Sequence, residues 1–107
     1  MQYDRRKHPR IKVTLSARWE GVLQGHEATV TSLSLGGCFV LSGGKVVPKE
    51  LVRLEIDLPN ESSILLWAEV VEEAYEIGFS AQFTSVSDDD AHSRLQQFVD
   101  SQLSLAS

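Results

Sequence analysis

The chain has 107 residues, of which 42% are hydrophobic and 23% are charged, which is typical of one folded globular domain. Its longest unbroken apolar run covers only residues 64–68, well short of the roughly 18 residues needed to cross a bilayer. The basic N-terminus has no apolar segment behind it, so we expect neither a membrane span nor a secretory signal.

The formal net charge of −5 conceals an uneven distribution of charge along the chain. Residues 1–18 carry six Lys or Arg and one Asp, whereas the remainder carries four basic and fourteen acidic residues. A concentrated basic segment captures a small anionic ligand even on an acidic protein, although solvated basic tails without a role are also common. Three of the four bases between Arg5 and Arg10 are arginines, which suit planar, bidentate recognition.

Cys38 is the only cysteine, so an internal disulfide is impossible and a reducing compartment is the simpler expectation. We therefore expect a cytoplasmic protein. Cys38 itself is expected to be a small buried packing residue, because no Cys–His–acid arrangement is visible in the sequence.

Apolar and polar residues alternate without interruption from Ile11 to Trp19, which predicts a half-buried strand. On the same grounds Ile77, Phe79, Ala81 and Phe83 are expected to share one face of the last strand. Glycine, proline and asparagine turns separate the strands. The six predicted strands cover residues 11–19, 27–32, 38–41, 51–58, about 63–73, and 77–84.

Apolar residues then recur at helical spacing from Ser87 to about Leu103, namely Ala91, Leu95, Phe98 and Val99. Ser87 is expected to cap this helix, and Asp88–Asp90 to lie in the first turn, where the helix dipole favours anions. Consecutive carboxylates splay around a helix axis, so we expect no metal site there. The pattern predicts an all-β fold with one helix: a six-stranded antiparallel β-barrel with a C-terminal α-helix packed against it.

Two arginines, Arg6 and Arg10, stand four residues apart in the basic segment. Pro9 biases His8 away from helix, which favours an extended arm. An arginine fork matches the O6/N7 edge of guanine, where a bidentate pair gives about 1–3 kcal/mol of discrimination, and it also matches phosphate oxygens. Arginine stacks on purine faces as well. The arm is therefore suited to an anionic purine ligand.

A second motif, Ser32-x-Ser34-x-x-Gly37, lies at the turn between the second and third predicted strands. Glycine lets backbone amides approach a ligand closely, and hydroxyls donate to phosphate or accept from a base edge. A plain hairpin turn uses the same residue types, so this motif alone does not indicate a site.

In order and spacing the two motifs resemble the PilZ domain family, bacterial receptors for cyclic di-GMP. That family carries an RxxxR arm and then a (D/N)xSxxG turn on a six-stranded barrel with a C-terminal helix. Arg6 and Arg10 match the arm, Ser34 and Gly37 match the turn, and the resemblance covers essentially the whole chain.

The resemblance implies roles for individual residues. Arg6 and Arg10 would hold the guanine edges and phosphates of cyclic di-GMP. Ser34 and the turn backbone at Gly36 would contact the ligand, and Gly37 would allow its close approach.

Three further positions follow from the same resemblance. Arg5 precedes the RxxxR motif, where in this family a second arginine accompanies binding of a stacked pair of ligand molecules. Gly78 resembles a family position on the barrel wall beside the ligand. Ser32 departs from the family, which has Asp or Asn there, and a hydroxyl accepts less well from the guanine edge. We expect this departure to weaken binding by an amount on the order of 1–3 kcal/mol.

We expect residues 1–10 to form a flexible basic ligand-binding arm and residues 11–107 a single PilZ-like barrel domain, with its helix from about residue 87. The expected function is that of a stand-alone cyclic di-GMP receptor and adaptor. Its arm would close over the dinucleotide against the Ser32–Gly37 turn and change the surface offered to an effector protein. The expected oligomeric state is a monomer or weak dimer.

No positioned acid–base pair, phosphate-binding loop or metal-ligand spacing is evident, so we expect no enzyme, no catalytic residues, no metal, and no cofactor besides the ligand. The main alternative is a degenerate PilZ-like protein-interaction module that does not bind cyclic di-GMP. Nucleic acid is not expected as a partner, because the barrel strands are acidic and carry no exposed aromatic row. A membrane is not expected as a partner either, since the longest apolar run is too short to span one. A nucleic-acid binder would lose affinity steeply with salt, whereas a guanine-reading pocket would reject adenine dinucleotides.

Overall fold

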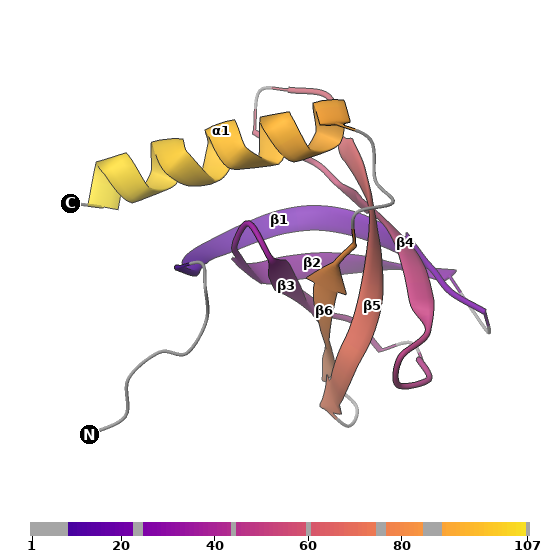
Figure 1. The fold of residues 1–107 in the computed structure, drawn as a ribbon. Helices are drawn as coiled ribbons and strands as arrows, with labels where there is room; N and C mark the ends of the chain where they lie inside the picture. The colour runs from indigo at the N-terminus through magenta and orange to yellow at the C-terminus, as the bar shows by residue number, and fades with distance from the viewer. Residues whose placement is uncertain are drawn as a thin grey trace, which may run out of the picture.

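The computed structural model describes residues 9–22, 25–43, 45–59, 61–74, 77–84 and 89–106. Within these ranges the chain forms six strands and one helix: β1 (Ile11–Glu20), β2 (Gly25–Leu33), β3 (Gly37–Leu41), β4 (Leu51–Ile56), β5 (Ile64–Ala74), β6 (Gly78–Phe83) and α1 (Asp89–Ala106). The strands close into a barrel in the order β1-β2-β3-β6-β5-β4, and each neighbouring pair is antiparallel. Figure 1 shows α1 lying across one end of this barrel. The expected all-β fold with one C-terminal helix is confirmed.

β1 shows how the alternating pattern produces the barrel wall. Leu15, Ala17 and Trp19 are buried inside, whereas the residues between them are partly or fully exposed. The ring of Trp19 meets the ring of Phe79 from β6 edge to face, with centroids 5.3 Å apart. The register of β1 against β2 shifts between Lys12 and Leu15, a β-bulge of the kind that bends a strand and increases its twist.

β6 differs from expectation at its start. The alternating pattern predicted that Ile77 shares the inward face with Phe79 and Ala81, and the latter two are buried. Ile77 instead precedes the strand in the β5–β6 turn, where its N–H donates to the carbonyl of Ala74 at 2.9 Å. Its carbonyl accepts from the Ser42 N–H at 2.9 Å, and the residue is 54% exposed at this end of the barrel.

β3 and β6 approach each other unusually closely at two glycines. A Cβ on Gly78 would lie 1.9 Å from the carbonyl oxygen of Val40, and a Cβ on Gly37 would lie 2.2 Å from that of Ala81. Only glycine permits backbones to pack in this way within a sheet. The two glycines therefore set the spacing of β3 and β6.

α1 is attached to the barrel by an apolar stripe and by one arginine. Leu95 and Val99 are buried, and the helix packs against β5 and β1. The Arg94 guanidinium donates to Glu61 Oε1 at 3.3 Å, to the carbonyl of Ser63 at 3.1 Å, and to the carbonyl of Ser62. Arg94 thereby ties the helix to the β4–β5 loop.

The helix begins at Asp89 and ends at Ala106, three residues beyond the predicted end. The predicted cap, Ser87, and its neighbour Asp88 lie outside the described residues. Among the residues that are described, no helix combines the length and hydropathy that crossing a bilayer requires.

A network of charges lies on the outer face of β1 and β4. Arg18 donates from Nε to Glu55 at 3.0 Å and from its two terminal nitrogens to Asp57 at 2.6 and 3.2 Å. Ser63 Oγ donates to the other oxygen of Glu55 at 2.7 Å. The hydrogen bond from Ser63, followed by that from Arg18, lowers the pKa of Glu55, and the bonds from Arg18 lower the pKa of Asp57.

Gly78→Ala should destabilise the fold strongly, because its Cβ would overlap the Val40 carbonyl and force β3 and β6 apart. We expect a loss of about 2–4 kcal/mol in the free energy of unfolding, measured by urea denaturation. Gly43→Ala is the matched control, since a Cβ there meets nothing within 4 Å, and it should change stability by less than about 0.5 kcal/mol. Equal stability of the two variants would contradict the close approach.

Arg18→Gln should reduce stability in a manner that depends on pH. Carboxyls whose pKa is lowered in the folded state contribute stability above their unfolded pKa, and this is lost as the pH falls through the folded pKa. We therefore expect the variant to be less stable than the wild type at about pH 7, with a difference that shrinks below about pH 4. Urea denaturation at stepped pH measures this difference.

Arg53→Gln serves as the control for this experiment. Its ion pair with Glu20 is longer, at 3.5 Å, and more exposed than the pairs of Arg18, so its effect should be smaller. A difference between wild type and Arg18→Gln that stays constant into acid would show that the network does not stabilise the fold through its carboxylates.

Candidate functional site

A cavity of about 720 Å³ lies where the start of β3, the second half of β5, the end of β6 and the first turn of α1 meet. It brings together residues from both ends of the chain. The lining residues are Arg10, Ser34, Leu35, Gly36, Gly37, Val71, Glu72, Ser80, Ala81, Gln82, Phe83, Thr84 and His92. Four of the residues predicted from the sequence, Arg10, Ser34, Gly36 and Gly37, are therefore placed around one space.

The turn at Ser34–Gly37 is held together by the Ser34 side chain. Its Oγ accepts from the N–H groups of Gly36 and Gly37, both at 3.1 Å, and donates to the Gly37 carbonyl at 3.3 Å. The Ser34 N–H donates to the same carbonyl at 2.9 Å. Ser34 is only 3% exposed, so in this arrangement it shapes the cavity wall and leaves little of its hydroxyl for a ligand.

The turn is also fastened to β6. The Phe83 N–H donates to the Gly36 carbonyl at 2.9 Å, next to the pairing of Gly37 with Gln82. The close approach at Gly37 permits this contact. The position of the turn relative to the end of β6 is thus fixed by the backbone.

Arg10 lines the cavity, and only part of its hydrogen-bonding capacity is used. Its Nη1 donates to Ser32 Oγ at 3.3 Å, which connects the two sequence motifs directly. Its Nε is buried and finds no hydrogen-bond partner among the residues that the structure describes. A buried donor without an acceptor is unfavourable, so the Arg10 guanidinium is suited to receive an acceptor from a ligand.

Cys38 lies close enough to Arg10 for the arginine charge to act on it. Burial raises the pKa of the Cys38 thiol to about 12, and the opposing effect of the Arg10 charge is smaller. Cys38 is fully buried in the core, as the sequence predicted, and it is protonated at neutral pH.

Four predicted site residues are not among those that line the cavity. Ser32 is one of them, although its Oγ accepts from Arg10. Arg5 and Arg6 lie outside the described residues. Gly78 is described, but it pairs with Leu41 at the opposite end of β6 from Gln82 and does not line the cavity. Its position explains the β3–β6 spacing, and its role beside a ligand stays a prediction.

Several lining residues escaped sequence analysis, among them Glu72, Gln82 and His92. They reach the cavity through strand pairing and helix docking, which no local pattern reveals. β5 carries a bulge between Val70 and Glu72, a shift in register that the sequence does not signal. Glu72 adds a carboxylate to the cavity and Gln82 an amide, so the wall offers both acceptors and donors besides the Arg10 cation.

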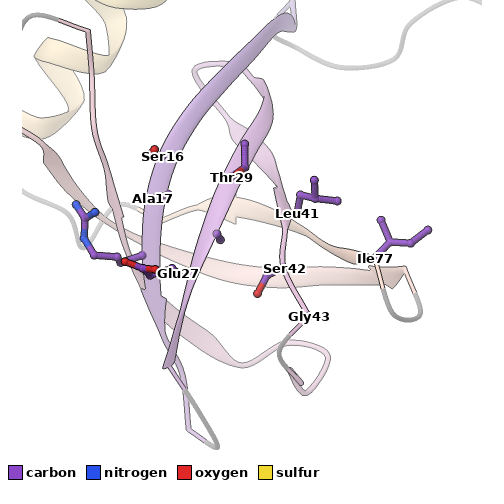
Figure 2. Close-up of a pocket in the computed structure, with 10 residues that line it drawn as sticks. Ser16, Ala17, Glu27, Thr29, Leu41, Ser42, Gly43 and Ile77 are labelled. Atoms are coloured by element: carbon purple, nitrogen blue, oxygen red, sulfur yellow. The ribbon is translucent and has the colours of Figure 1, made fainter.

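A second hollow of about 690 Å³ lies on the outside of β1, β2 and β3. Figure 2 shows Leu41 and Ile77 on one side of it and Glu27 on the other. The one cationic side chain among its described lining residues is already engaged, since Arg18 binds Glu55 and Asp57, and Ser42 Oγ accepts from Trp19 Nε1 at 3.0 Å. The Arg10 cavity is therefore the better candidate for an anionic ligand.

In the described part of the chain, no group of three or more His, Cys, Asp or Glu side chains is arranged so that it could hold a metal ion.

The family model of the PilZ domain matches residues 4–101. The chain belongs to the PilZ domain family. PilZ domains are receptor and adaptor modules. A comparison with curated protein sequences finds no significant match to this chain.

Several solved structures share the fold at low sequence identity. The PilZ domain of YcgR from Escherichia coli, solved with c-di-GMP, has a TM-score of 0.76 and 16% identity over 96% of this chain and 95% of that one. The inhibitor of motility MotI from Bacillus subtilis has a TM-score of 0.73 and 22% identity over 95% of this chain and 53% of that one. The MrkH–c-di-GMP complex of K. pneumonia has a TM-score of 0.78 and 16% identity over 97% and 55%. This chain thus spans about half the length of MotI and MrkH.

Proposed function

We propose that this PilZ domain is a cyclic di-GMP receptor and adaptor, and that the Arg10 cavity is its binding site. The observation that carries the proposal is that Arg10, from the RxxxR motif, and the Ser34–Gly37 turn line one cavity, and that the buried Arg10 Nε has no hydrogen-bond partner among the described residues. The cavity volume of about 720 Å³ is within the range of about 300–1,000 Å³ for small-ligand sites. YcgR and MrkH, whose folds it shares, were solved with c-di-GMP.

In this proposal the arginines recognise the dinucleotide. Arg10 donates to a phosphate or to the O6/N7 edge of a guanine, and Arg6 does the same from the arm. Arg5 accompanies the binding of a stacked pair of ligand molecules. Ser34 acts on the ligand by fixing the turn backbone, which places Gly36 and Gly37 against it.

In this proposal, the signal to a partner protein arises when the site closes over the ligand. The arm closes over the ligand against the Ser32–Gly37 turn, and the altered surface near the arm and α1 is read by an effector protein. We place this function in the cytoplasm, with neither nucleic acid nor membrane as partner and without catalysis.

A second candidate function is a protein-interaction module that does not bind the ligand. It is favoured by Ser32, which stands where the family carries Asp or Asn, and by the Ser34 hydroxyl, whose hydrogen bonds are made within its own turn. The arginines are intact, and for that reason we favour weakened binding over none.

Calorimetric titration with cyclic di-GMP tests the receptor function. We expect saturable binding by the wild type, little binding of cyclic di-AMP, and at least about a tenfold loss of affinity in Arg10→Ala, because a charged hydrogen-bond donor is removed. Arg53→Ala is the control, since Arg53 is exposed on β4 and does not line the cavity. Absence of wild-type binding would favour the interaction module, and unchanged affinity in Arg10→Ala would place the ligand elsewhere.

Ser32→Asp should tighten binding of cyclic di-GMP by about tenfold. An aspartate accepts two hydrogen bonds with charge assistance from the guanine edge, and it also holds Arg10, which now bonds the weaker serine hydroxyl at 3.3 Å. Ser32→Ala, which removes the acceptor, is the matched control and should bind no more tightly than the wild type. If Ser32→Asp leaves the dissociation constant unchanged, position 32 does not contact the guanine.

A further inference from the structure

α1 contributes one side chain to the cavity. His92, in the first turn of the helix, lines it together with Arg10 and the turn. Its Nε2 is buried and finds no hydrogen-bond partner within the described ranges. Within the described part of the chain, the buried side-chain nitrogens without a partner are thus Arg10 Nε and His92 Nε2, and both belong to residues of the same cavity wall.

Two orphaned nitrogens beside one cavity indicate the kind of ligand that fits. Arg10 Nε is always a donor, and an imidazole Nε2 donates in one of its tautomers and in the imidazolium form. A ligand rich in acceptors satisfies both, and a cyclic dinucleotide offers phosphate oxygens and the O6 and N7 atoms of its purines. Both nitrogens are covered by protein, so each side chain must turn toward the ligand as it enters.

His92 is well placed to connect the ligand with the helix. Arg94, two residues further on, binds the β4–β5 loop, whereas His92 faces the cavity at the turn, β5 and β6. α1 is also held by an apolar stripe that includes Leu95 and Val99. A bond from the ligand to His92 therefore adds a polar attachment for the helix on the side of the cavity.

We propose that His92 donates a hydrogen bond from Nε2 to the bound cyclic dinucleotide and thereby fixes the first turn of α1 against the occupied cavity. This inference rests on the proposed receptor function. In this proposal, ligand binding in the cavity changes how firmly α1 is held, and an effector protein senses that change through α1. Figure 1 shows that the C-terminal end of this helix extends past the strands, and there Leu105 is 77% exposed.

The test uses the full chain with cyclic di-GMP and three variants. His92→Phe keeps a ring of similar shape without a polar atom, and His92→Gln restores an N–H at a similar reach. Ser93→Ala is the control, because Ser93 is an exposed neighbour on α1 that does not line the cavity. Calorimetry gives the dissociation constant, and hydrogen exchange by mass spectrometry reports protection of residues 89–106 at saturating ligand.

We expect His92→Phe to bind about five- to tenfold more weakly than the wild type, His92→Gln to recover most of that loss, and Ser93→Ala to bind like the wild type. The ligand should slow hydrogen exchange in the first turns of α1 in the wild type and in His92→Gln. Saturated His92→Phe should show no such protection. If His92→Phe fails to fold, His92→Ala removes the same bond without adding volume and carries the same expectation.

The outcomes separate this proposal from the one on which it rests. The role of His92 would be overturned if His92→Phe bound the ligand with wild-type affinity and showed wild-type protection of α1. If Arg10→Ala were still impaired in that case, the receptor function would stand. No binding of cyclic di-GMP by the wild type would overturn the receptor function, and the role of His92 with it.

Discussion

β3 and β6 pair so closely that a side chain at position 37 or 78 would overlap a backbone carbonyl of the opposite strand. The rest of the site depends on this contact. It joins the two halves of the barrel, and at its Gly37 end it brings the turn beside the last residues of β6. Phe83 then hydrogen-bonds Gly36, and the end of β6 becomes a wall of the cavity. Gly37 therefore acts on the site mainly through the fold, because it allows the close pairing of β3 with β6.

The hydrogen bonds around the cavity divide into those already made and those left open. The turn is closed by Ser34, and Ser32 holds one nitrogen of Arg10. Arg10 Nε and His92 Nε2 are left without partners among the described residues. On the outer face of β1, by contrast, all three guanidinium nitrogens of Arg18 donate to Glu55 and Asp57, and these bonds stabilise the barrel. Basic residues near the N-terminus thus have different tasks, which net charge alone does not reveal.

Local patterns predicted most of the fold. The alternation in β1 and the helical spacing after residue 84 specified both elements within a few residues, because they reflect which faces are buried. Ile77 followed the same alternation but lies in a turn, since its N–H bonds Ala74 outside the ladder. The site was predictable only where a motif carries it, as at Arg10 and the Ser34–Gly37 turn. Glu72 and His92 enter it through a bulge in β5 and through helix docking, and these depend on contacts between distant parts of the chain.

The most direct test of the account is a two-dimensional amide NMR titration of the wild-type chain with cyclic di-GMP, which locates the ligand on the structure. The account predicts that the largest shift changes fall on Arg10, the Ser34–Gly37 turn, Ser80–Thr84 and His92, around the Arg10 cavity. Changes centred instead on the outer hollow between Ser16 and Thr29, or no changes at saturating ligand, would contradict it.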